Sequence, residues 1–337
     1  MLTQTSRPRR TAAVFGLAAA LLVAVGVLSV LVGARPLDPG EVLAALTGRA
    51  DPVVTEVVME QRMPRTVVGL LVGAGLAVAG VLMQTLTRNP LADPRLFGVS
   101  AGASLGVVVG ISVLGLTSLS QYAWLGIAGA LVVGTVSYFV ATAASRHADT
   151  PVTFALVGAA LDASLTAVIY AILTTDVQSF DQYRFWAVGS LAGRDPSVAQ
   201  GMAPFLLFGL AVAFLLARGL DALALGDDTA RGLGHRLGAT RAAAALAVAL
   251  MTGAAVAAAG PIAFVGLVVP HLARRLVGPS HRPLIALAVL LGPVLVLGAD
   301  IVGRKIVPGE APAGVLCALI GAPLLIALVR RAKALSV

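Results

Sequence analysis

The sequence predicts an all-α polytopic membrane protein with about ten transmembrane helices. Of its 337 residues, 58% are hydrophobic and 12% are charged, and the mean hydropathy is +0.95. A soluble domain is about half apolar and about a quarter charged. The apolar residues are also grouped in blocks of about 20, the length at which a helix crosses roughly 30 Å of hydrocarbon. Because an unpaired backbone polar group is costly in lipid, each block has to be helical.

Ten such blocks follow one another along a single predicted domain, residues 1–337. The first block begins with basic residues like a signal peptide, but its apolar run exceeds the roughly 7–15 residues of a signal core, so we interpret it as a retained span. The seventh and eighth blocks are separated only by the breaker pair Gly260–Pro261. The predicted spans are 12–34, 64–86, 95–115, 121–143, 152–174, 198–217, 240–259, 261–277, 284–302 and 313–330.

The distribution of Lys and Arg predicts that both termini are cytoplasmic. With ten spans the termini share one side of the membrane, and 16 of the 24 basic residues fall on that side. Cytoplasmic loops are the ones enriched in Lys and Arg. The net charge of +8 therefore sits at the edges of the spans and does not indicate a nucleic-acid-binding face. The other eight basic residues are Arg35, Arg49, Arg62, Arg65, Arg184, Arg194, Arg304 and Lys305.

The stretch RNPLADP, residues 88–94, separates two apolar spans on the cytoplasmic side. Pro90 and Pro94 cannot lie inside a helix, so they predict a compact turn. Asn89 is suited to bind the backbone groups that become free there.

The sequence lacks the motifs with which a transporter would energise itself. The phosphate-binding signature GxxxxGK[ST] needs a Lys after Gly, whereas the two lysines follow Arg304 and Ala332. Ion-coupled carriers place ionisable residues near the middle of the membrane. Only Asp162 and Asp300 come close to this position, and we interpret both as capping or pairing within the bundle. The spans also contain no Ser–His pair or HExxH motif, which argues against an intramembrane enzyme.

The longest polar segment on the cytoplasmic side is residues 218–238. Within it, DDTARGL has the acidic first turn that suits a helix dipole. A short helix with glycines near both ends is a shape that another protein can grip, although an ordinary solvated loop has the same composition. The presence of this segment argues against a channel.

No cofactor or metal site is expected in this chain. Cys317 is the only cysteine, so an intrachain disulfide is impossible. None of the four histidines, including His271, is paired at metal-ligand spacing.

Several spaced motifs resemble those of the FecCD-type permeases, the membrane subunits of ABC importers for iron–siderophores, haem and cobalamin. The block from RMPRTVVGLL to FGVSAGA is similar to the second and third spans of that family. GPIAFVGLVVPHLARR and the residues that follow it, together with APAGVLCALIGAP, are similar to the last three. FWAVGSLAG (185–193) is similar to an extracytoplasmic W-x-x-GSL element, and LGDDTARGLG (225–234) to the ATPase-contacting loop. These motifs occur in the family's order between about residues 62 and 324.

The resemblance implies the type II ABC importer permease fold in the bacterial cytoplasmic membrane. Two identical or related permeases would form a pore at their interface. Two cytoplasmic ATP-binding subunits would hold ATP and Mg, and an extracytoplasmic substrate-binding protein would deliver the ligand. The ligand would be an iron–siderophore complex, with haem and cobalamin left open. The alternative is an ion-coupled secondary transporter of a bulky solute.

The resemblance also assigns an ATPase-coupling role to the segment 225–234. Asp227 and Asp228 would start its helix. Gly226 and Gly234 would permit tight turns, since glycine reaches positive φ without strain. The apolar contact with the ATPase would come from Leu225, Ala230 and Leu233.

Two further sets of residues receive roles in the same way. Arginine suits bidentate binding of carboxylates, so the outer-side Arg62, Arg65 and Arg304 would dock the binding protein. Anchoring of helix ends at the lipid headgroups is the alternative.

The turn after the second span would shape the inner gate of the pathway, unless it is only a rigid connection. Its residues are Gln84, Asn89, Pro90 and Leu91.

Overall fold

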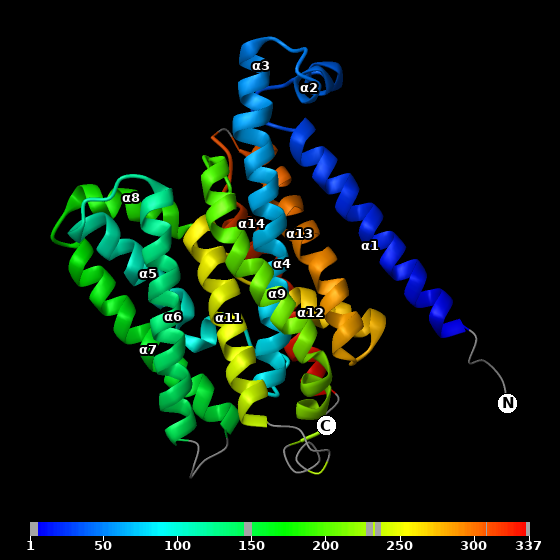
Figure 1. The fold of residues 1–337 in the computed structure, drawn as a ribbon, viewed down its shortest axis with the longest axis vertical. Helices are drawn as coiled ribbons and strands as arrows, with labels where there is room; N and C mark the ends of the chain where they lie inside the picture. The colour runs from blue at the N-terminus through cyan, green and yellow to red at the C-terminus, as the bar shows by residue number, and fades with distance from the viewer. Residues whose placement is uncertain (1–5, 145–149, 227–231, 233–236, 308, 335–337) are drawn as a thin grey trace.

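The computed structural model describes residues 6–144, 150–226, 232, 237–307 and 309–334, and within them the protein is a bundle of helices without a strand. Most of the long helices run in roughly the same direction (Figure 1). The short helices α2, α3 and α8 lie at one end, which we refer to as the outer end. The helix α1 begins, and α14 finishes, toward the opposite or inner end (Figure 1).

The helices follow the apolar blocks of the sequence. The long ones are α1 Ser6–Leu31, α4 Met63–Leu86, α6 Leu119–Ala144, α7 Thr150–Leu173, α9 Pro196–Ala224, α11 Leu237–Ala259, α13 His281–Ile306 and α14 Ala313–Ala334. The shorter elements are α2 Pro39–Leu46, α3 Pro52–Glu56, the π-helical turn η1 Val57–Arg62, the 3-10 turn η2 Pro94–Phe97, α5 Val99–Val108, the π-helical turn η3 Val109–Val113, α8 Val177–Ala187 and α12 Val265–Val277.

Each of the ten predicted spans coincides with one helix or with consecutive helical elements. Seven helical stretches of the described chain are long and apolar enough to cross a membrane. The third and eighth predicted spans are shorter than expected, because their first residues are not part of the helix. The backbone is left-handed just before each helix, at Gly98 (φ +67°) and Phe264 (φ +68°), so α5 begins at Val99 and α12 at Val265.

The helix α4 lies in the middle of the bundle, in contact with α9, α11, α12 and α13 (Figure 1). The stretch Pro52–Leu86 contains α4, and 83% of its most apolar window is buried. The buried share of the corresponding window is 11% in α1 and 17% in α7. Helices with so little buried surface present most of their side chains to lipid or to another chain. The other helices therefore pack around α4.

Small residues allow the neighbours of α4 to approach its backbone. A Cβ atom on Gly73 would lie 2.5 Å from the Cα of Pro293 in α13. On Gly80 it would lie 2.0 Å from the carbonyl oxygen of Gly266 in α12. Lipid tails are as apolar as the side chains, so membrane helices associate largely through such close van der Waals packing. The glycines thus set how closely α12 and α13 pack on α4.

We expect Gly73→Ala to destabilise the protein by about 1–3 kcal/mol, the usual cost of overpacking a close-packed core. Gly16→Ala is the matched control, because a Cβ there meets nothing within 4 Å. The measurement is the midpoint of heat unfolding in detergent. Equal midpoints for the two variants would contradict the proposed role of Gly73.

Candidate functional site

Two arginines from other elements hold the outer end of α1. The last four carbonyl groups of a helix have no partner within it. Arg62, at the start of α4, donates to the carbonyl oxygens of Val30 and Leu31 at 2.8 and 2.7 Å. Arg304, near the end of α13, donates to that of Ser29 at 2.6 Å. A positive charge at the C-terminal end of a helix is also favoured by the helix dipole. The two guanidinium groups therefore join α1 to the rest of the bundle.

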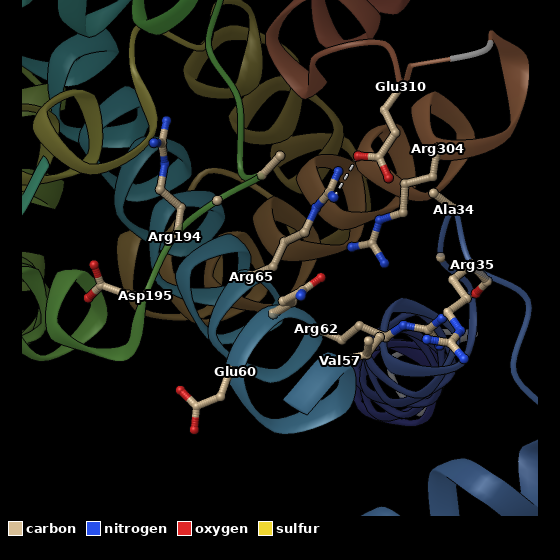
Figure 2. Close-up of a pocket in the computed structure, with 14 residues that line it drawn as sticks. Ala34, Arg35, Val57, Glu60, Arg62, Arg65, Arg194, Asp195, Arg304 and Glu310 are labelled. Atoms are coloured by element: carbon tan, nitrogen blue, oxygen red, sulfur yellow. Dashed lines mark hydrogen bonds and ion pairs between the residues drawn. The ribbon is translucent and has the colours of Figure 1, made fainter. Parts of the chain in front are cut away.

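The carboxylate of Asp300 is buried between two arginines. Arg65 Nη2 donates to Asp300 Oδ1 at 2.8 Å, and Arg304 Nε donates to Oδ2 at 3.0 Å. Arg65 Nη1 donates in turn to Glu310 Oε2 at 2.7 Å (Figure 2). The prediction that Asp300 pairs within the bundle is confirmed. Both oxygens of this carboxylate already accept hydrogen bonds from cationic groups.

The structure brings the three arginines predicted to dock a binding protein together at one outer cavity of about 610 Å³. Arg62 and Arg304 are buried, and the side chain of Arg65 is only 12% exposed. All three donate to partners within the chain. Docking by these residues stays a prediction, and their observed role is to join helices. The cavity is also lined by Arg35, Glu60, Arg194, Asp195 and Glu310 (Figure 2).

The FWAVGSLAG stretch connects α8 to two other helices at the outer end. The backbone N–H of Ser190 donates to the carbonyl oxygen of Ala259, at the end of α11, at 2.8 Å. The N–H of Gly314, at the start of α14, donates to the carbonyl oxygen of Gly189, also at 2.8 Å. Trp186 is buried beside this connection. The stretch is therefore fixed in place before the chain enters α9.

At the inner end, the RNPLADP turn is built as its residue types predict. Asn89 Oδ1 accepts a hydrogen bond from the N–H of Leu91 at 2.9 Å. Asn89, Pro90 and Leu91 are all exposed. Gln84, by contrast, is buried and accepts a hydrogen bond from Arg274 Nη1 in α12 at 3.0 Å. The gate role of these four residues stays a prediction; in this structure Gln84 joins α4 to α12 and the other three form an exposed turn.

A buried histidine joins the inner ends of α4, α9 and α13. His281 Nε2 lies 2.7 Å from Thr85 Oγ1 on α4, and Nδ1 lies 2.7 Å from Asp221 Oδ1 on α9. Arg88 adds a second link, with Nη2 3.4 Å from the carbonyl oxygen of Leu223. Sequence reasoning missed this cluster, because residues 85, 221 and 281 belong to three separate segments. The available signal was His281 itself, an ionisable residue just before the predicted span 284–302.

The predicted ATPase-coupling segment begins where α9 ends. Leu225 is exposed, and Gly226 has φ +107°, a left-handed turn of the kind expected of a glycine there. The remaining coupling residues, Asp227, Asp228, Ala230, Leu233 and Gly234, lie outside the described residues. Among the residues that the structure does describe, no group of three or more His, Cys, Asp and Glu side chains is placed to hold a metal ion.

A profile of the FecCD transport family matches residues 21–331. The chain belongs to this family. It therefore has the type II fold of an ABC transporter permease, and with its apolar helices it is a multi-pass protein of the inner membrane. The FecCD family membership agrees with the motifs that carried the resemblance.

Relatives of known name support the assignment. The chain is 44% identical over 323 residues to the ferric enterobactin transport system permease protein FepD of Escherichia coli K12, with 96% of each chain covered. It is 39% identical over 273 residues to the Fe(3+)-citrate import system permease protein YfmD of Bacillus subtilis 168, covering 81% of this chain and 80% of the relative.

A solved structure described as an inward-facing metal-chelate type ABC transporter is also similar. It has a TM-score of 0.82 and 28% sequence identity, over 95% of this chain and 99% of that chain. The similarity therefore covers the whole bundle, including both of its ends.

We expect Asp300→Asn to cost about 3–5 kcal/mol in stability, because removing one partner of a buried ion pair leaves charge uncompensated. Asn keeps the size of the side chain but leaves Arg304 without its carboxylate. The measurement is heat unfolding in detergent. Asp181→Asn is the control, since its pair with Arg184 is more than half exposed on both sides and should contribute less than about 1 kcal/mol. Similar losses in both variants would contradict this account of the cluster.

Proposed function

We propose that this chain is the membrane-spanning permease subunit of an ATP-driven importer that carries a ferric siderophore into the bacterial cytoplasm. The observation that carries the proposal is the 44% identity to the E. coli ferric enterobactin permease over 96% of both chains. Two B. subtilis relatives are named for Fe(3+)-citrate and iron(3+)-hydroxamate import. These names favour a ferric chelate over haem or cobalamin.

ATP hydrolysis would be performed by separate cytoplasmic subunits. The sequence has no phosphate-binding signature of its own. The segment 225–234, beginning with the exposed Leu225, is the proposed contact with the ATPase. The end of α9 and the start of α11, which flank this segment, lie at the inner end, so the inner end would be cytoplasmic, with both termini on that side. A movement of the segment would reach α4 through Asp221 and His281, which are in direct contact.

The main alternative, an ion-coupled secondary transporter, has less support. It needs an ionisable group that can bind and release an ion near the middle of the membrane. Asp300 is held by Arg65 and Arg304 instead. The side chain of Asp162, on α7, is exposed, so the prediction that it also caps or pairs within the bundle is not confirmed.

The exposure of Asp162 favours a second permease beside this one. Its side chain lies on the surface of α7 together with Leu156, which is 66% exposed. An ionised carboxylate facing lipid would cost roughly 2.5–3.5 kcal/mol or more. An identical or related permease, with a water-filled passage between the two, removes that cost. On the outer face, an extracytoplasmic binding protein would deliver the chelate.

We expect replacement of both Asp227 and Asp228 by Ala to reduce uptake of the cognate ferric siderophore to background. The loss of both acids removes two negative charges from the segment that would contact the ATPase. The measurement is accumulation of radioactive iron from a panel of siderophores, beside labelled haem and cobalamin, in cells that carry either version of the chain.

The control is a chain with Glu56→Ala and Asp181→Ala, which removes two exposed acidic side chains at the outer end. It should transport like the unaltered protein, with equal amounts of all three chains in the membrane. Uptake that survives in the Asp227–Asp228 variant and follows a proton or sodium gradient would refute the proposed mechanism. Uptake of haem or cobalamin alone would refute the proposed cargo.

A further inference from the structure

Arg194 lies in the loop between α8 and α9, where two outer cavities meet. One cavity, of about 610 Å³, contains the Arg62–Arg65–Arg304 cluster. The other, of about 690 Å³, opens on the side of α6 and α8. Arg194 lines both of them. Its guanidinium group extends away from the cluster (Figure 2).

The charge of Arg194 is poorly compensated within the chain. Its Nη2 donates to the carbonyl oxygen of Ser190 at 2.9 Å, but its Nε is buried and has no hydrogen-bond partner among the described residues. The neighbouring Asp195 attracts this charge, but its Oδ1 accepts a hydrogen bond from the N–H of Ser197 at 2.8 Å and caps α9. Burial is the main cause that lowers the pKa of Arg194; Arg65 lowers it further, and Tyr122 and Asp195 act in the opposite direction.

This arrangement differs from that of Arg65 and Arg304, which have carboxylate partners, and from that of Arg62, which donates to three backbone carbonyl groups. Arg65 is paired with two carboxylates, and Arg304 with Asp300. A guanidinium remains charged in proteins, and buried charges are normally paired. A buried donor without a partner beside an open cavity therefore points to an anionic ligand that is absent from the isolated chain.

The residues that line the second cavity indicate the chemistry of the rest of such a ligand. Phe185 is 67% exposed, whereas Tyr122 and Trp186, which also line the cavity, are buried. Gln182 adds an amide. Cavities of roughly 300–1,000 Å³ with apolar and aromatic walls and few polar groups are typical of small-molecule sites. A single acidic side chain of a docked protein would leave most of this volume empty.

We propose that Arg194 and the aromatic wall beside it form a binding site at the outer mouth for an anionic, aromatic iron chelate of the catecholate class. This proposal rests on the proposed function and specifies the chemistry of its cargo. Arg194 binds the oxygen anions of the chelate with its remaining donors, and the exposed Phe185 packs against the aromatic rings. Arginine is suited to both contacts, since it binds oxyanions with two parallel donors and stacks on aromatic faces.

The test is direct binding to the full-length chain in lipid nanodiscs without ATP. The chain has two tryptophans, so Trp124→Phe leaves Trp186, which lines the cavity, as the fluorescent reporter. The probes are ferric enterobactin, which is anionic, and a neutral ferric tris(hydroxamate). Quenching of Trp186 is titrated in this background and in Arg194→Gln, Arg194→Lys and Arg49→Gln variants. Arg49 is the matched control, an exposed arginine between α2 and α3 that lines neither cavity.

We expect Arg194→Gln to weaken binding of ferric enterobactin by roughly tenfold or more, as for loss of a charge-assisted hydrogen bond. Arg194→Lys should recover part of the affinity, and Arg49→Gln should leave it unchanged. Binding of the neutral hydroxamate should not depend on residue 194. Equal weakening of both chelates would mean that Arg194 only shapes the loop, and would overturn the proposal.

Three other results would also overturn it: unchanged affinity in Arg194→Gln, no saturable quenching with the unaltered residue, or a loss confined to the affinity for a binding protein. The last would make Arg194 a docking residue for an acidic protein surface. Failure of the proposed function is seen separately, as absence of ATP-dependent iron uptake by the unaltered chain. The nanodisc measurement needs neither ATP nor transport.

Discussion

The close backbone contact between α4 and its neighbours is the constraint on which the rest of the structure depends. Gly73 and Gly80 leave no room for a Cβ atom against α13 and α12, so the three helices meet nearly backbone to backbone. Burial of apolar surface gives little drive for association within lipid, and close packing has to replace it. Once α4 is enclosed in this way, the polar groups at its two ends are also surrounded by protein and have to find partners there.

The polar groups at the two ends of α4 find their partners in different ways. At the outer end, Arg65 and Arg304 share Asp300, and this ion-paired cluster joins α1, α4 and α13. At the inner end, Gln84 joins α4 to α12, and His281 and Arg88 join the ends of α13 and α4 to the last turns of α9. The outer cluster is thus one buried ion-paired network, whereas the inner links are separate contacts. The inner links lie next to the segment proposed to contact the ATPase.

Local patterns predicted the spans and the RNPLADP turn, because hydropathy and proline act within a few residues. They did not predict the left-handed residues Gly98 and Phe264, which shorten two helices. The pairing of Asp300 was expected from its position, but its partners were not, since Arg65 is 235 residues away in the sequence. Nor did the pattern distinguish Arg304, which pairs with Asp300, from Arg194, which has no such partner, because both are outer-side arginines. Only the fold determines which arginines find partners within the chain.

The most direct test of the central claim is to identify the energy source in proteoliposomes that contain the chain with its partner permease and ATPase subunits. Uptake of ferric siderophore is measured with the binding protein on the side of the outer end. The account predicts accumulation when ATP is supplied at the inner end, and none with a proton or sodium gradient alone. Accumulation driven by either gradient without ATP would contradict the assignment of this chain to an ATP-driven importer.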